Sequence, residues 1–277
     1  MVELNNALSD AIVRACQEKQ LPILQLRPYG EVASDLDLMF SAEPSYKLAI
    51  ELLVKCSDPW ELGQKQRRLF FQSMEVGERI VLLFQLLKMH GIHETDYQLQ
   101  CKEPSCRESI EFPLSFHRLS EKQRRSAKEK TLRVENTEGG QSLSIRRPTG
   151  LDQAAWMNRG FVKLEQILKS LIVHVEGQED DTWIFSKMDE ISTKLEDFDP
   201  LVAYQVQTIC PCCNYEAVYP VKLEAMALKK IKAFQSELLG SVHELASRYH
   251  WSEETILKMP SWRRHYYRQR IAKGNGL

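Results

Sequence analysis

The chain has 277 residues, of which 43% are hydrophobic and 27% charged, a composition typical of a globular protein with one large domain or two modest ones. Its formal net charge of −1 excludes a global electrostatic bias towards nucleic acid or anionic membranes. The longest apolar runs, such as 81–84 and 171–173, are far shorter than the roughly 18 residues that span a bilayer, so no membrane segment is expected.

Residues 1–58 are predicted to form an N-terminal helix and an irregular extension. Within 1–20, apolar residues recur at helical spacing, and no apolar core or cleavage pattern of a signal peptide is present, so no recognisable export signal is expected. From 21 to 58, prolines and a glycine interrupt the chain, which predicts irregular structure with short extended pieces such as Ile23–Leu26.

The next helix is predicted from five apolar residues on one helical face: Val76, Ile80, Leu83, Phe84 and Leu87. Gly91 is expected to cap its C-terminus. A strand then enters Cys101, and the alternating strand 109–112 leaves Cys106. A strand on each side of a cysteine turn is the layout of half a zinc ribbon.

Residues 117–130 are highly charged, with few apolar anchors. A solvated helix or linker is favoured there over a binding patch, because Glu121 and Glu129 interleave with the basic residues. The next predicted elements are a β-hairpin with strands 131–134 and 142–145 and a helix capped by Thr149. They are followed by an acidic loop at 176–181, which lacks EF-hand spacing and is expected to face solvent, and by a further helix at 184–195.

A second cysteine turn holds Cys210 and Cys213, between a strand and the alternating residues 218–221. Cys-x-x-Cys after a strand is a specific metal-binding signal, and Cys-x₄-Cys is within the range that zinc sites use. Asn214 stands where a zinc turn commonly carries Gly, and Asn tolerates positive φ. We therefore expect one structural zinc per chain, held by Cys101, Cys106, Cys210 and Cys213.

Alternatives to this ligand set remain open at the sequence level. Cys212 could replace a neighbouring cysteine, and His90, His93 or His117 could stand in for a thiolate. Five of the seven cysteines cluster at the two turns, which is a poor disulfide framework and favours a reduced, cytoplasmic protein. The simple alternative is that the cysteines are ordinary buried thiols.

Catalysis is not predicted. The chain contains no P-loop, GxGxxG, HExxH or GxSxG motif, and its acids and histidines are scattered, so neither an enzyme nor a small-molecule substrate is expected. Four thiolates would close a zinc coordination shell and leave no position for a catalytic water.

Residues 222–277 are predicted to form a C-terminal helical arm. It begins with a long helix from 223 and continues in two shorter ones, the first capped by Ser252 and the second opened by Pro260. The last helix carries the candidate partner-binding residues, which are Trp262, Arg263, Arg264, Tyr266, Tyr267 and Arg270. Simple packing of its aromatic residues onto the long helix is an alternative.

A helix-turn-helix for DNA is a second alternative for the arm. It is disfavoured because Glu253 and Glu254 would begin the recognition helix with charge of the wrong sign.

Several motifs occur together in a characteristic order: Met74–Arg79, Arg146–Gln153, Cys210–Cys213, His243–Ala246, Tyr249–Glu254, Ile256–Leu257 and Arg263–Arg264. This order resembles the baseplate hub and hub-assembly proteins of T-even-type contractile phage tails, whose relatives occur in loci for contractile injection systems. The resemblance covers about residues 60–272. The first cysteine pair departs from it, with x₄ in place of x₂, and Cys212 is extra.

The resemblance implies a non-enzymatic part in building a contractile tail, as a hub component or assembly chaperone acting with hub, spike, tube or tape-measure proteins. Assembly would take place in the cytoplasm, with or without incorporation into the finished particle. The expected fold is α+β and mainly helical, with a composite zinc ribbon inside a core of residues 59–221. The alternative function is a zinc-containing DNA-binding regulator.

Overall fold

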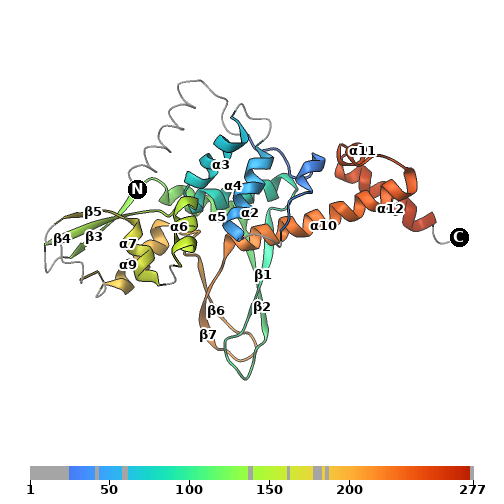
Figure 1. The fold of residues 1–277 in the computed structure, drawn as a ribbon. Coiled ribbons are helices and arrows are strands. Elements are labelled where there is room, and N and C mark those ends of the chain that lie inside the picture. The colour runs from blue at the N-terminus through green and yellow to red at the C-terminus, as the bar shows by residue number, and fades with distance from the viewer. Residues whose placement is uncertain are drawn as a thin grey trace. The chain divides into compact units, whose positions relative to one another are not determined.

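The computed structural model describes residues 25–40, 44–57, 62–136, 140–160, 163–176, 183–184 and 187–274. In this part the protein is α+β and mainly helical, as the sequence predicts, with three separate antiparallel sheets (Figure 1). The described residues form two compact units, a central unit of residues 70–223 and a terminal unit of residues 25–69 with 224–274.

The predicted domain division differs from this arrangement. It separates residues 1–58, 59–221 and 222–277, whereas the structure joins 25–69 to the C-terminal helices in one unit. The physical reason is a set of contacts with α10 (Leu223–Tyr249), in which the Gln235 amide donates to the backbone oxygens of Leu36 and Leu38, at 3.0 Å each.

The terminal unit consists mostly of helices. These are η1 (Ala33–Asp35), α2 (Ser45–Cys56), the first part of α3 (Gln64–Ser73), most of α10, α11 (Glu253–Leu257) and α12 (Ser261–Gly274). The long helix and the Ser252 cap, whose hydroxyl accepts from the Thr255 N–H, are confirmed. The predicted helix in 1–20 lies outside the described residues, as do the first two residues of Ile23–Leu26.

Helix α2 corrects the expectation of irregular structure in 21–58. Its buried residues include Ala49 and the consecutive Leu52, Leu53 and Val54, so apolar residues surround the helix axis. A helix that is apolar on most of its surface lacks the one-sided periodicity by which amphipathic helices are recognised. The prolines at 22, 28 and 44 all precede this helix and do not interrupt it.

The central unit carries the sheets. Its elements are α4 (Val76–Met89), β1 (Glu94–Gln100), β2 (Ser109–Ser115), α5 (Phe116–Ser126), β3 (Thr131–Asn136), β4 (Gln141–Arg146), α6 (Gly150–Arg159), α7 (Leu164–Leu171), β5 (Ile172–Glu176), α9 (Met188–Phe198), β6 (Gln205–Ile209) and β7 (Glu216–Pro220).

Most of these elements match the predicted ones. Gly91 follows α4 at φ +76, and Thr149 forms a capping box with Asp152 at the start of α6. Helix α9 begins at Met188, four residues after the predicted start at 184, and ends at Phe198. The helices α3 and α7 and the strand β5 were not predicted, and all but the first residue of the acidic loop 176–181 lies outside the described residues.

The sheet of order β3-β4-β5 packs against helices through one apolar cluster. The fully buried members include Val134, Leu143 and Ile145 from the strands, with Leu168 from α7 and Ile191 from α9. This cluster explains why the charged segments between the cysteine turns fold, since each contributes an apolar face to a shared core.

Two of the sequence motifs form a single structural joint. The Val76 N–H at the start of α4 donates to the Pro148 oxygen at 2.9 Å, and Arg79 is fully buried with its Nη2 donating to Gln153 Oε1 at 2.5 Å. A Cβ on Gly150 would lie 2.8 Å from Arg79 Nη1, so glycine allows this approach.

Arg147 belongs to the same joint and is also buried, with 2% of its surface exposed to solvent. Its guanidinium donates to the backbone oxygens of Ser126, Glu129 and Phe198 at 2.7–3.0 Å, and its Cζ lies 3.9 Å from the centroid of the Phe198 ring. Because the Ser126 and Phe198 carbonyls are the last of α5 and α9, the cation satisfies groups that a helix end leaves unpaired.

Candidate metal centre

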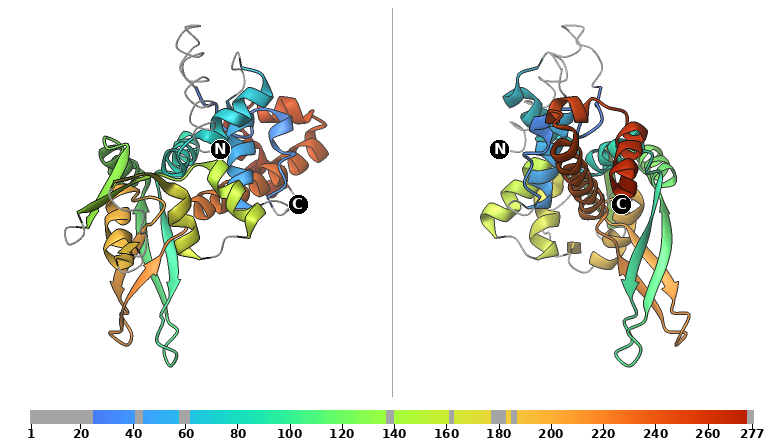
Figure 2. Two further views of the ribbon diagram at one scale, coloured as in Figure 1. Left: turned by 60° about the vertical axis from the view of Figure 1, so that its left-hand side comes forward. Right: turned by 90° about the vertical axis from the view of Figure 1, so that its right-hand side faces the viewer.

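Two β-ribbons bring the cysteine turns together. Strands β1 and β2 pair up to Gln100 and Ser109, and β6 and β7 pair up to Ile209 and Glu216, so that each cysteine turn lies at the end of a ribbon. Figures 1 and 2 show the two ribbons running side by side, with their turns at the same end.

The two turns have the same local construction. The N–H of the first cysteine donates across the turn, from Cys101 to the Glu108 oxygen at 2.8 Å and from Cys210 to the Tyr215 oxygen at 2.9 Å. The residue after the second cysteine is left-handed in both, with Arg107 at φ 50 and Asn214 at φ 58. The positive φ predicted for Asn214 is therefore confirmed, and the two turns share these two features although the first is longer.

Four cysteine sulfurs meet where the turns touch. The Sγ atoms of Cys101, Cys106, Cys210 and Cys213 all lie within 4.8 Å of one another. Cys101 and Cys213 are 3.6 Å apart and Cys106 and Cys210 are 3.8 Å apart, distances that are far too long for disulfides, and all four thiols are free. A tetrahedral ion with metal–sulfur bonds of about 2.3 Å separates its ligands by about 3.8 Å, so the cluster is compatible with a bound metal.

The remaining candidate ligands lie elsewhere. Cys212 is exposed and is outside the cluster, and no histidine belongs to a metal-ligating group within the described residues. Cys56 is buried in α2, and Cys16 lies outside the part of the chain that the structure describes. Of the ligand sets left open by the sequence, the structure brings together the one with Cys210 and Cys213.

The thiols of the cluster differ in how readily they ionise. The backbone N–H groups of Cys213 and Cys212 lower the pKa of the Cys210 thiol to about 7, whereas burial raises the pKa of Cys101 to about 12. Without a cation, the buried sulfurs therefore resist simultaneous ionisation. A bound dication reverses this balance, because it lets every coordinating thiol ionise.

Protein contacts outside the sulfurs also join the ribbons. The Lys102 N–H donates to the Tyr219 hydroxyl at 3.2 Å, and the Lys102 ammonium donates to the Val218 oxygen at 2.5 Å while lying 4.9 Å from the Tyr219 ring centroid. Beneath them, Ile110 and Tyr219 pack with Cys101 and Cys210. The sequence alone does not single out Lys102 or Tyr219, because Lys102 directly follows Cys101 whereas Tyr219 lies in β7, six residues after Cys213.

The candidate partner-binding residues divide into two groups on α12. Trp262 is 70% exposed and Tyr266 is 47% exposed, and Arg263 and Arg270 are also exposed, so packing onto the long helix does not account for them. Arg270 donates to the Tyr266 hydroxyl at 2.9 Å, which fixes both side chains on the helix surface.

The other two candidates hold α12 in place. Arg264 donates to the Met259 oxygen at 2.6 Å, and the Tyr267 ring lies 5.5 Å from Tyr249 and 4.9 Å from Trp251. These two residues position the helix and leave its exposed face to the remaining four.

Comparisons of the chain with protein-family models, with curated proteins and with solved structures found no match. Among the described residues, no helix combines the length and the apolar character needed to cross a bilayer.

Proposed function

We propose that the four-cysteine cluster binds one structural zinc ion per chain and that this ion joins the two ribbons. The observation that supports the proposal is the set of sulfur–sulfur distances, which match a tetrahedral thiolate site. Four thiolates leave no open position for substrate or water, so the zinc stabilises the fold and takes no part in catalysis. In small peptides a structural zinc contributes on the order of 10–16 kcal/mol of apparent binding free energy.

The zinc-joined protein serves as a non-enzymatic structural or assembly-chaperone component of a contractile, phage-tail-like baseplate. The resemblance of its ordered motifs to hub and hub-assembly proteins supports this role. Its partners are other tail proteins of the hub, spike, tube or tape-measure type, and assembly takes place in the cytoplasm, where reduced cysteines suit a metal site.

The exposed face of α12 is the contact surface for such a partner. Trp, Tyr and Arg dominate interface hot spots, and Trp262, Tyr266, Arg263 and Arg270 present these residue types together on one anchored helix. An ion pair of 2.7 Å from Arg268 to Glu244 fastens α12 to α10 within the terminal unit. A face of this kind suits binding without large rearrangement.

A DNA-binding regulator is less well supported by the same helices. The would-be recognition helix α11 has only five residues, and its Glu253 and Glu254 are exposed. Carboxylates at that position repel phosphates.

Co-expression with tail proteins tests the proposed function. Wild-type protein should co-purify with a hub-type tail protein, and a W262A/Y266A variant should lose the partner while keeping its zinc. Deleting the gene from a strain that makes such particles should abolish assembled tails in electron micrographs. Normal tails in the deletion strain would contradict the role, and a strongly salt-dependent affinity for duplex DNA would favour the regulator.

A further inference from the structure

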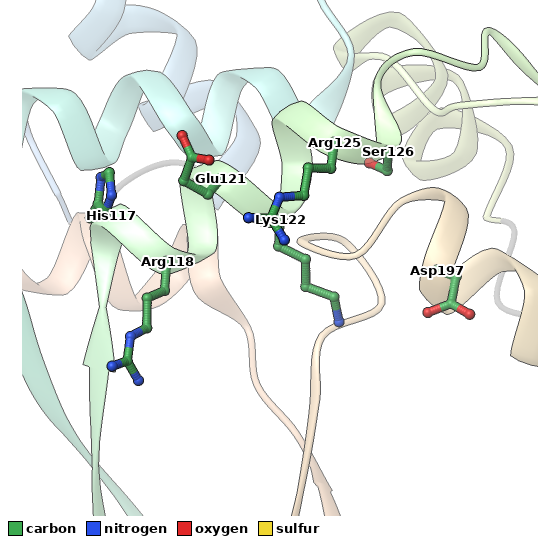
Figure 3. A pocket seen from close by; sticks show the side chains of 7 residues that line it. All are labelled: His117, Arg118, Glu121, Lys122, Arg125, Ser126 and Asp197. Carbon is green, nitrogen blue, oxygen red and sulfur yellow. The ribbon is translucent and has the colours of Figure 1, made fainter.

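A second candidate binding surface lies on α5 in the central unit. A hollow of about 500 Å³ is lined by His117, Arg118, Glu121, Lys122, Arg125, Ser126 and Asp197 (Figure 3). An adjoining hollow of about 590 Å³ shares Arg118 and Lys122 and extends to Tyr204 and Gln205. Together these two hollows form what we call the α5 groove.

The cations of the α5 groove occupy one side of the helix. Arg118, Lys122 and Arg125 stand at i, i+4 and i+7, a spacing that places side chains on one helical face. In Figure 3 these side chains leave α5 on the same side, whereas Glu121 points away from them and Asp197 stands apart on α9.

These three cations form no ion pair within the described part of the chain. None of its ion pairs involves Arg118, Lys122 or Arg125, and all three side chains are exposed. The neighbouring Arg124, on the other side, pairs with Glu121 at 2.8 Å. Glu121 also lines the first hollow, so the groove presents three cations without ion-pair partners beside a carboxylate that Arg124 already pairs.

Part of the floor of the groove, in the second hollow, is apolar. Leu114 and Leu119 are buried beneath it, and the ammonium of Lys122 lies 5.9 Å from the centroid of the Tyr204 ring. A ligand that fits must offer negative charge to one wall and apolar groups to the floor.

We propose that the α5 groove binds an acidic segment of a partner protein in an extended conformation, with carboxylates at alternate positions. Along a helix axis, Arg118 and Lys122 are separated by about 6 Å and Lys122 and Arg125 by about 4.5 Å. Alternate residues of an extended strand are about 6.6 Å apart and point to the same side, so every second residue can reach a cation. The residues between them, or the flanking ones, supply the apolar contact.

Nucleic acid fits the groove less well than a protein segment. Glu94, Glu121 and Asp197 line it together with the cations and would repel a uniformly charged phosphate backbone. A peptide can place its carboxylates opposite the three cations and keep uncharged residues opposite the three acids.

Selection from a random peptide library displayed on yeast tests this inference. The library is selected on the zinc-loaded protein and counter-selected on an R118Q/K122Q/R125Q variant. Enriched peptides should carry Asp or Glu at alternate positions with apolar residues between them. Failure of any peptide to distinguish the two proteins would overturn the proposal, as would enrichment of uncharged or basic peptides.

Fluorescence anisotropy with an enriched peptide then measures the contribution of the charges. The triple variant should bind about tenfold or more weakly, since it removes three ion pairs. A matched variant, K128Q/K163Q/K222Q, loses the same charge from exposed lysines outside the groove and should bind as wild type does. Equal weakening in both variants would show that only the net charge of the protein matters, which would overturn the proposal. If a single-stranded oligonucleotide displaced the peptide at a lower concentration than the peptide itself needs, the ligand of the groove would be nucleic acid and the proposed protein segment would be wrong.

Discussion

Gln123 of α5 donates from its amide Nε2 to Asp199 Oδ1 at 3.2 Å in the interior of the central unit. Each of these side chains keeps one further buried oxygen, Gln123 Oε1 and Asp199 Oδ2, without a hydrogen-bond partner. Burial raises the pKa of Asp199 to about 7. Protonation turns Asp199 Oδ2 into a hydroxyl and removes the negative charge from a buried carboxyl that accepts a single side-chain hydrogen bond.

The Asp199 proton predicts a dependence of stability on pH. The folded-state pKa lies above the ordinary value of 3.8 for an aspartic acid, so the contribution of Asp199 to stability is fully present below about pH 4 and is lost as the pH rises towards 7. Asp199→Asn keeps an oxygen that can accept from the Gln123 amide and carries no charge. The variant should equal wild type in unfolding free energy at low pH and exceed it by a few kcal/mol above pH 7.

Denaturant unfolding of both proteins across this pH range, with zinc in excess, measures that difference. The pH dependence of metal binding is common to both proteins and therefore cancels in the comparison. Asp197→Asn is the matched control, since Asp197 is exposed two residues away and should show no such divergence. A constant difference between D199N and wild type at all pH values would contradict the protonated pair.

Zinc content is predicted to follow the cluster residue by residue. Purified wild-type protein should contain one zinc per chain by mass spectrometry, and Cys101→Ser and Cys213→Ser should each lose it, because three thiolates and a hydroxyl hold zinc poorly. Cys212→Ser should keep the metal, since Cys212 is exposed outside the cluster. Retention of zinc in either of the first two variants, or loss in the third, would show a different ligand set.

Helix α12 offers a test that separates its exposed face from its anchor. Replacing both Trp262 and Tyr266 by Ala should leave the thermal unfolding midpoint nearly unchanged, because their side chains lie largely in solvent. Tyr267→Ala should reduce the free energy of unfolding by about 1–3 kcal/mol, because it removes the ring that contacts Tyr249 and Trp251. Equal destabilisation by both changes, measured by circular dichroism, would assign Trp262 and Tyr266 to packing.

Two glycines in helices predict opposite effects of the same substitution. A Cβ on Gly77 would lie 2.3 Å from Gln123 Nε2 and 2.7 Å from Asp199 Oδ1, so Gly77→Ala should destabilise by about 1–3 kcal/mol. Gly240 in α10 has no atom within 4 Å of such a Cβ, so Gly240→Ala should stabilise by about 0.5–1 kcal/mol. Calorimetric unfolding of both variants measures the contrast, and a neutral Gly77→Ala would show that Gln123 can move aside.

The features predictable from sequence are those in which a short stretch carries its own signal. The cysteine turns, the capping box at Thr149 and the left-handed Asn214 each follow from the chemistry of a few adjacent residues. Helix α2 carries no such signal because its burial on most sides removes the periodic pattern, and β5 carries none because pairing with β4 defines it.

Pairs that are distant in sequence carry no local signal at all. Gln123 and Asp199 are 76 positions apart, and Lys102 and Tyr219 are 117 apart. The α5 groove likewise depends on Tyr204 and Asp197 arriving beside a helix that, by itself, is only a charged stretch. These sites follow from the tertiary fold and become visible only once the central unit is assembled.

The separation of the two cysteine turns also orders events during synthesis of the chain. Cys101 and Cys213 lie 112 positions apart, so the ribosome completes the first turn long before the second exists. Until β6 and β7 have emerged and paired, the nascent protein offers a metal only half of its ligands. For the proposed zinc ion, capture is therefore a late event, which follows the synthesis of β7 near the end of the central unit.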